Sequence, residues 1–444
     1  MKRAFKYRFH PTDAQAAELS RTFGCVRKVY NPALAARSEA WTTRKERVGY
    51  GQTSAMLTSW KRTEELSCLA EVSSVPLQQA LRHVQAAFVG FWEKRSQYPR
   101  FKSKRKSGAS AEYTRSAFRY ADGRLTLAKM AEPLHVVWSR PLPEGVEPST
   151  VTVSRDSAGR RFASLLCTDI PTPTPVTTAA VGIDAGLTSL VTLSTGEKVA
   201  NPKHERRDRA RLVRAHRALS RKEKSSNNRA KARTKVARIH ARIADRRRDH
   251  LHQLTTRLVR ANQTLVIEDL TVRNMLKNQK LARATTDAAW RELRSILNYK
   301  AAWYGRDLIT VDRWFPSSKL CSACGAIAEA MPLNVREWTC GNCGTTHNRD
   351  ENAAINLLAA GPAVSACGTG ARPQWESSSR LGRFVVKQET PPAMVGIPSS
   401  QGGEEVKDAP SSNPPRRHRS PCRGSSSGSG RAGSSHTSPD PAAQ

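Results

Sequence analysis

Two short cysteine motifs constrain this chain more than any other feature of its sequence. Cys321-Ser-Ala-Cys324-Gly and Cys340-Gly-Asn-Cys343-Gly are separated by fifteen residues. Zinc favours four thiolates in a tetrahedron, and each CxxC turn supplies two of them. We therefore expect a structural zinc ribbon over residues 317–345. Four protein ligands would leave the ion no open position for catalysis.

Three carboxylates at the ends of apolar segments form the second feature. Asp184 ends the strand-like run AVGID, Glu268 ends TLVIE, and Asp350 opens the helical segment DENAAINLLAAG. A charge directly after a buried strand costs free energy unless it is paired or binds a metal. The three residues lie 84 and 82 positions apart. Only the fold of the chain can bring them together.

The order of the expected elements suggests how this happens. A β-hairpin with a third strand is followed by basic helices, the strand of Glu268, further helices, a strand over 307–314 and a final helix over 346–360. This is the order of an α/β RNase H-like domain, here over residues 178–316 with the zinc ribbon inserted before the last helix. Such a site would hold two magnesium ions, which prefer carboxylate oxygen and water. One ion would activate water and the other would stabilise the leaving 3′ oxygen of a phosphodiester. Arg349 would either steer the phosphate or form a surface salt bridge.

The charge of the chain indicates a polyanionic partner. Lys and Arg number 73 against 38 Asp and Glu, a formal net charge of +35. Such an excess repels itself unless a polyanion neutralises it, and nucleic acid is the usual one. Residues 201–260 contain 21 basic and 5 acidic residues. A solvated helix face laced with salt bridges would mix both signs, so we expect a helical hairpin that faces nucleic acid. Arg221 and Lys222 are candidate contacts within it.

The sequence gives no sign of a membrane protein. It has no run of about twenty apolar residues that would span a bilayer. Its first residues, MKRAFKYRFHPT, lack the apolar stretch of a signal peptide. The other five cysteines are scattered, which argues against a disulfide framework and for a reducing compartment. We expect a cytoplasmic protein associated with the nucleoid.

The rest of the chain divides by composition. Residues 1–11 read as a strand in which aromatic and basic residues alternate, and helical patterns fill much of 12–112. Short β-like runs occupy 113–177, and the stiff PTPTP segment near their end marks a domain boundary. Residues 361–444 are rich in Ser, Pro and Gly, which predicts a disordered basic tail.

Several motifs together resemble the OrfB/TnpB family of insertion-sequence proteins, relatives of the compact type V CRISPR effectors. They include FGCVRKVYN (23–31), GIDAGLTSLVTLS (182–194), VIEDLTVRNMLKN (266–278), WFPSSKLCSACG (314–325) and CGNCGTTHNRDENAAINLLAAG (340–361). The resemblance spans about residues 1–361. It implies a β wedge domain split by a helical recognition insert, followed by a RuvC nuclease domain. It also assigns catalysis to the three carboxylates and zinc binding to the four cysteines.

The same resemblance implies an activity. Family members are expected to bind a guide RNA transcribed from the transposon end and to cut double-stranded DNA beside a short adjacent motif. Gln78 or Gln79 could read adenine edges in that motif, although a helix-surface role is equally consistent with the sequence. Two alternatives stay open. One is a catalytically silent relative that only binds DNA and represses transcription, and the other is a conventional transposase that performs strand transfer.

Overall fold

The computed structural model describes residues 2–104, 108–168, 174–332 and 334–366. The last helix continues through Ala366, so the boundary expected at 361 is six residues too early. The remainder of the expected tail lies outside the described residues. Within the described part, no helix is long and apolar enough to cross a membrane.

The first sheet has five antiparallel strands in the order β2-β6-β7-β1-β5. Its first strand shows why it forms, because Phe5, Tyr7 and Phe9 are buried and the residues between them are exposed or half-buried. The strand expected over residues 1–11 and the β-like runs that follow residue 112 are therefore confirmed. The strands are β1 (Lys2–His10), β2 (Ala109–Thr114), β5 (His135–Val137), β6 (Pro148–Arg155) and β7 (Arg161–Thr168), beside a small hairpin of β3 (Phe118–Ala121) and β4 (Arg124–Leu127).

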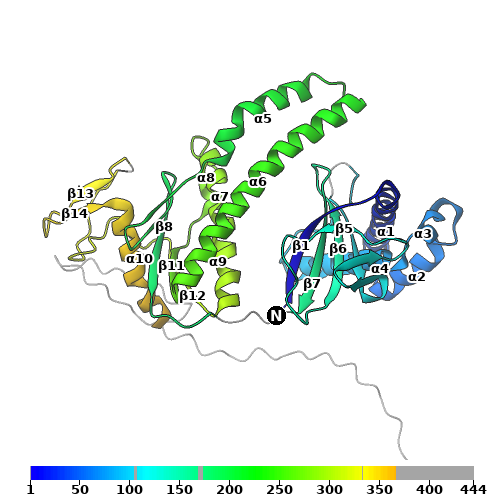
Figure 1. Ribbon diagram of the computed structural model, residues 1–444, viewed down its shortest axis with the longest axis horizontal. Helices are drawn as coiled ribbons and strands as arrows, with labels where there is room; N and C mark the ends of the chain where they lie inside the picture. Colours follow the sequence, from blue (N-terminus) through cyan, green and yellow to red (C-terminus); the bar gives the residue numbers. More distant parts are fainter. Residues whose placement is uncertain (1, 105–107, 169–173, 333, 367–444) are drawn as a thin grey trace, which may run out of the picture. The chain divides into compact units, whose positions relative to one another are not determined.

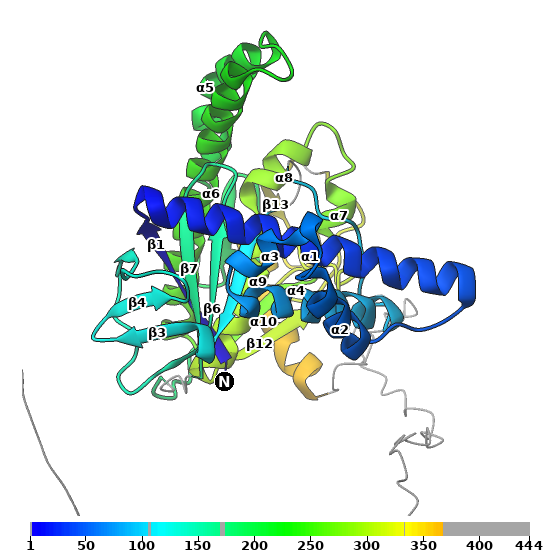
Figure 2. The same ribbon diagram turned by 90° about the vertical axis from the view of Figure 1, so that its right-hand side faces the viewer.

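Helices fill most of the interval between β1 and β2. Thr12 begins the first helix, because its hydroxyl accepts a hydrogen bond from the backbone of Gln15. The first and last of these helices pack against each other (Figure 2). Strand β2 starts at Ala109, so the end of the expected insert, 109–112, belongs to the sheet instead. The helices are α1 (Asp13–Arg44), α2 (Tyr50–Trp60), α3 (Cys68–Glu71) and α4 (Ser74–Trp92).

The second sheet has the order β10-β9-β8-β11-β12. Strands β8, β9 and β10 are antiparallel, whereas β8, β11 and β12 run parallel. One face packs on α6 and α9, and the other packs on α10 (Figure 1). The element order predicted from the sequence is the order observed. The strands are β8 (Ala180–Ala185), β9 (Ser189–Leu193), β10 (Lys198–Ala200), β11 (Thr264–Glu268) and β12 (Asp307–Val311), and the helices are α5 (His204–Ser220), α6 (Asn227–Ala261), α7 (Val272–Met275), α8 (Ala282–Ala288), α9 (Trp290–Tyr304) and α10 (Arg349–Ala366).

The basic stretch forms a helical hairpin of α5 and α6 (Figure 1). Leu212 and Ala215 of α5 pack on Val236, Ile239 and Ile243 of α6, which leaves the basic side chains on the outside. The expected helical hairpin is therefore observed, with its turn between Ser220 and Asn227. A short ribbon lies between β12 and α10, with strands β13 (Glu337–Thr339) and β14 (Thr346–Asn348).

Candidate metal centres

Two of the three predicted carboxylates lie on neighbouring strands. Strands β8 and β11 pair in parallel, with Ile183 opposite Ile267. The next residues along the two strands are Asp184 and Glu268. Parallel strands lie about 4.8 Å apart, so these side chains leave the same face of the sheet side by side.

The third carboxylate arrives on α10, which touches the sheet backbone to backbone. A Cβ on Gly182 would lie 2.0 Å from the carbonyl oxygen of Ala354, so only glycine allows this approach. Asp184 lies two residues beyond Gly182 on the same face, about 6.6 Å further along β8. Asp350 lies one turn before Ala354, about 6 Å back along α10. These two distances, measured from the contact between Gly182 and Ala354, are nearly equal. The first turn of α10 therefore lies near Asp184.

The electrostatics of Asp184 reflect this gathering. Burial, followed by the negative charges of Asp350 and Glu268, raises the pKa of Asp184 to about 7. Arg349 and Arg336 oppose this rise only in part. Burial and the neighbouring Asp269 likewise raise the pKa of Glu268. In the described part of the chain, neither carboxylate accepts a hydrogen bond, so both oxygen pairs remain available to a ligand.

Asp269 follows Glu268 directly but serves a different purpose. Arg294 and Arg313 both form salt bridges with its carboxylate, the second at 2.6 Å. These bonds lower the pKa of Asp269 although partial burial opposes them. Glu268 has no such partner among the described residues. Of the two adjacent acids, Glu268 is therefore the one that can bind a cation.

This donor set fits a hard divalent cation such as magnesium. Magnesium takes carboxylate oxygen and completes its shell with water. Half-buried carboxylates without donors cost free energy, which a bound cation would reduce. Among the described residues, however, only the four cysteines already have ligand atoms within 4.8 Å of one another. The carboxylate oxygens are more widely spaced, as expected for anions that repel one another.

Two arginines lie beside this group. Arg336, in the arm between the cysteine motifs, places Nη1 3.3 Å from Oδ1 of Asp350. Arg336 could not be predicted from the sequence, because no pattern in the arm links it to the carboxylates. Arg349 donates from Nη1 to the carbonyl oxygen of Pro332 at 2.9 Å. Arg349 forms no salt bridge with the described residues, so of the two expected roles the salt bridge is not observed there.

The four predicted cysteines do meet. Their sulfurs lie within 4.8 Å of one another, with Cys321 to Cys343 and Cys324 to Cys340 both at 3.7 Å. A tetrahedron with zinc–sulfur bonds of about 2.3 Å has edges of about 3.8 Å. The spacing therefore fits zinc.

Polar groups around the sulfurs add to this fit. The Thr345 hydroxyl lies 3.2 Å from Cys343 Sγ, and its hydrogen bond lowers the pKa of that thiol to about 6. Nε2 of His347 lies 3.0 Å from Cys321 Sγ, a contact that the sequence analysis missed. The position of His347, four residues after Cys343, is the one signal that could have indicated it.

The zinc ribbon is tied to α10 by two asparagines. Asn356 donates to the carbonyl oxygens of Ser317 and Leu320 at 2.8 and 2.7 Å. Asn352 donates to Leu320 at 2.7 Å, and its own oxygen accepts from the backbone of Ser322. Both asparagines are buried. The helix that carries Asp350 is thus bonded directly to the start of the ribbon.

The remaining candidate residues lie on other elements. Gln78 is exposed and Gln79 half-buried on α4, and neither side chain forms a hydrogen bond within the described residues. Arg221 and Lys222 are exposed in the turn between α5 and α6. The structure leaves these positions accessible without testing what they bind.

Family models match three parts of the chain. Residues 151–279 match a model described as "Probable transposase", and residues 290–357 match "Cas12f1-like, TNB domain". Residues 1–46 match a model described as "Helix-turn-helix domain". In the structure this last region is strand β1 followed by the single helix α1.

Curated relatives resemble the chain over most of its length. A protein of Streptomyces pristinaespiralis named "Putative RNA-guided DNA endonuclease" is 71% identical over 398 residues, which are 90% of this chain and 98% of the relative. A protein of Escherichia coli K12 with the same designation is 35% identical, over 83% of this chain and 95% of its own. Among solved structures, a Cas12f1 complex with guide RNA and target DNA matches with a TM-score of 0.50 at 15% identity. The match covers 77% of this chain and 82% of that one, which shows a shared fold.

Proposed function

This chain belongs to the OrfB/TnpB family, and we propose that it is a transposon-encoded, RNA-guided DNA endonuclease. One observation carries the chemical part of this proposal. Asp184, Glu268 and Asp350 are gathered at one end of a sheet, and burial, followed by the charges of Asp350 and Glu268, raises the pKa of Asp184 to about 7. The names of the relatives support the guided part.

We assign the three carboxylates to catalysis. They would hold two magnesium ions, which supply an activated water and stabilise the leaving oxygen of the phosphodiester. Asp184 interacts electrostatically with both Asp350 and Glu268. Its pKa near neutrality means that it gives up a proton when the cation binds. Arg336 keeps Asp350 in place and offsets part of the negative charge.

The nucleic acid partners would be a guide RNA from the transposon end and a double-stranded DNA target. A guide–target duplex is held through its backbone, which calls for many basic contacts. The hairpin of α5 and α6, including Arg221 and Lys222, supplies such a surface. The first sheet and its helices would act as the wedge domain and recognition insert. Gln78 or Gln79 would then read the motif beside the target.

The two alternatives fit less well. A silent DNA-binding relative would not need three neighbouring carboxylates, two of which, Asp184 and Glu268, accept no hydrogen bond within the described residues. A conventional transposase would need its own helix-turn-helix to read transposon ends. The region matched by that model contains one continuous helix, Asp13–Arg44, and no turn between two helices.

The test begins with RNA that co-purifies with the protein. Its sequence supplies the guide, from which a matched DNA duplex is made and its magnesium-dependent cutting is measured. We expect Asp184→Ala to abolish cutting while the bound RNA is retained. Asp307→Ala is the matched control, because Asp307 is exposed at the other end of the same sheet. Full cutting by Asp184→Ala, or no bound RNA in the unaltered protein, would refute the proposal.

A further inference from the structure

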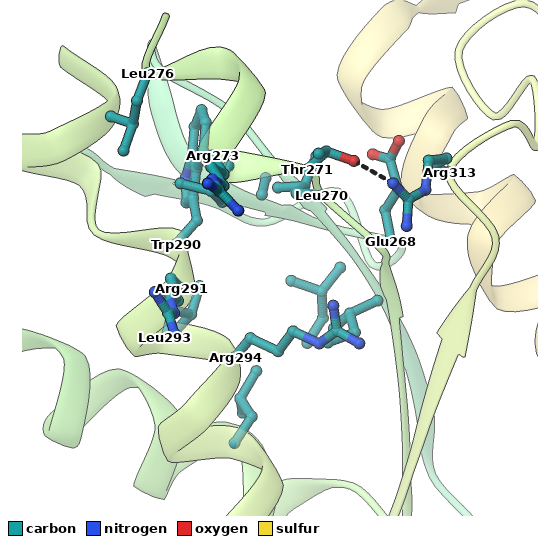
Figure 3. A pocket seen from close by; sticks show the side chains of 15 residues that line it. Glu268, Leu270, Thr271, Arg273, Leu276, Trp290, Arg291, Leu293, Arg294 and Arg313 are labelled. Atoms are coloured by element: carbon teal, nitrogen blue, oxygen red, sulfur yellow. Dashed lines mark hydrogen bonds between the residues drawn. The ribbon is translucent and has the colours of Figure 1, made fainter. Parts of the chain in front are cut away.

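A cavity of about 570 Å³ opens beside Glu268, on the face of the sheet that packs against α9. Figure 3 shows Glu268 at one side of this cavity and residues of α7 and α9 at the other. Leu270, Leu276, Trp290 and Leu293 provide an apolar lining. Leu276 is 42% exposed, so apolar surface faces solvent at its rim. The cavity therefore reaches Glu268 at the end of β11, whereas Asp184 and Asp350 lie on the α10 side of the sheet and do not line it.

The charge of the cavity is unbalanced. Its lining includes four arginines, of which Arg294 and Arg313 share one salt-bridge partner, Asp269. Arg273 and Arg291 are exposed and have no ion pair or hydrogen bond from their guanidinium groups in the described part of the chain. Figure 3 shows both on the side of the cavity away from Glu268. Two free guanidinium groups beside an apolar cavity favour an occupant that joins an anion to an apolar body.

Trp290 adds a second, independent observation. It lines the cavity, it is only 4% exposed, and its Nε1 has no hydrogen-bond acceptor among the described residues. A buried indole N–H normally finds a partner. An occupant with acceptor atoms on the edge of a flat ring would satisfy it, and nucleobases have this character. The cavity volume lies within the range of known small-ligand sites, so it accommodates a nucleotide.

We propose that this cavity binds one nucleotide of the DNA strand that the carboxylate site cuts. The base enters the apolar part, and a flanking phosphate lies between Arg273 and Arg291. The inference rests on the proposed nuclease function and specifies how the strand is positioned. Glu268 borders the cavity at the end of β11, so a strand held there and passing round that end of the sheet would bring a neighbouring phosphodiester to the carboxylates on the α10 face.

The test uses photocrosslinking, because its readout does not depend on cutting. The probe is a short single-stranded oligonucleotide of 5-iodouracil deoxynucleotides, added to the full-length protein without magnesium. Crosslinked residues are mapped by mass spectrometry after digestion. We expect a crosslink in the segments that carry Leu276 or Trp290. Crosslinks confined to other segments would overturn the proposal.

Two variants and one matched control sharpen this result. Arg273→Gln with Arg291→Gln removes the unpaired charges, and we expect about a tenfold loss of this crosslink. Leu276→Trp fills the rim of the cavity and should reduce the crosslink without a change of charge. Lys280→Gln with Arg283→Gln removes the same charge from exposed positions that do not line the cavity, and should leave it intact. Equal crosslinking in all variants would contradict the assignment.

Magnesium-dependent cutting of the matched duplex is measured on the same preparations. Cutting without a crosslink at the cavity would refute the subsite and leave the nuclease function standing. A crosslink at the cavity without cutting would support the subsite and refute the nuclease function.

Discussion

Gly182 and Ala354 are in backbone contact, at a distance that no side chain on Gly182 would permit. This contact sets where α10 crosses the sheet, and therefore where Asp350 lies relative to Asp184. We expect Gly182→Ala to lower the free energy of unfolding by about 3 kcal/mol, because neither backbone can yield without moving its neighbours. It should also abolish cutting, since α10 would shift away from β8.

The control for this prediction is Gly24→Ala. Gly24 lies within α1, and a Cβ there would meet nothing within 4 Å. Alanine should stabilise that helix by about 0.5–1 kcal/mol and leave cutting unchanged. Urea unfolding and the cutting assay measure both variants. Equal stability of the two glycine variants would show that the contact does not constrain the site.

Asp184→Asn should stabilise the metal-free protein at alkaline pH. The carboxyl has a pKa of about 7 in the folded chain, far above its ordinary value of 3.8. The folded state therefore binds a proton that the unfolded state has lost between about pH 4 and 7, and stability falls as pH rises through this window. Asparagine avoids this cost. We expect a gain on the order of 2 kcal/mol at pH 8 and almost none at pH 4.

Without metal, Asp184→Asn should be the more stable protein at pH 8. Added magnesium should make the unaltered protein the more stable one. It should stabilise the unaltered protein and not the Asp184→Asn variant, which can be followed as a shift in the melting temperature. A variant that is less stable than its parent at pH 8 without metal would contradict the electrostatic description of the site.

Cys340→Ser should abolish zinc binding, which metal analysis of the purified protein can measure. We expect the ribbon to lose its structure, because its short strands β13 and β14 bury too little apolar surface to fold without an ion. Cys68→Ser is the control, since Cys68 lies on α3 outside the cysteine cluster. Zinc retained at the same stoichiometry in Cys340→Ser would refute the assignment.

His347→Ala should keep zinc but weaken its binding. The imidazole Nε2 lies 3.0 Å from Cys321 Sγ, where an N–H donor stabilises the thiolate. Groups that support metal ligands in this way typically change affinity by about 10- to 100-fold. Competition with a chromophoric chelator measures the change. An unchanged affinity would mean that the histidine only fills space.

Lys300→Met should change how stability depends on pH. Lys300 is buried in α9 and donates to His252 O, Thr255 Oγ1 and Thr256 Oγ1. Burial, with a smaller effect of Arg260, lowers its pKa from 10.5 to about 8. Below pH 8 both the folded and the unfolded chain carry the proton, so the cost of the buried charge is complete. As pH rises from 8 to 10.5 the folded chain loses this proton first, and stability increases.

The unaltered protein should therefore gain about 2 kcal/mol relative to Lys300→Met across that interval. Urea unfolding at pH 8 and pH 10 measures the difference. A constant difference between the two proteins would show that Lys300 titrates normally.

The parts of the site that could be predicted are those encoded locally. The spacing of Cys321 and Cys324 indicates a metal site. Glu268 is recognisable because it follows an apolar strand. The order of strands and helices along the chain could also be predicted from hydrophobic periodicity. These signals depend on neighbours in sequence, so one chain is enough to see them.

The parts that could not be predicted depend on contacts between distant segments. Arg336 reaches Asp350 only because the ribbon folds back over α10, and nothing around residue 336 indicates this. The close approach of Gly182 to Ala354 is likewise invisible until the helix is placed on the sheet. The cavity beside Glu268 arises where three elements fail to fill the space between them, which no local pattern encodes.

Asn352 and Asn356 have a consequence beyond holding the zinc ribbon. They lie two and six residues after Asp350 on the same helix, so a rearrangement of the ribbon would be transmitted to a proposed ligand of the other metal centre. The two ions are then heterotropic effectors of each other, since coupling between binding sites is reciprocal. Zinc occupancy would shift the magnesium concentration at which the protein becomes active, and magnesium would change the affinity for zinc by the same factor. The availability of one metal in the cell would thus set the threshold for the other.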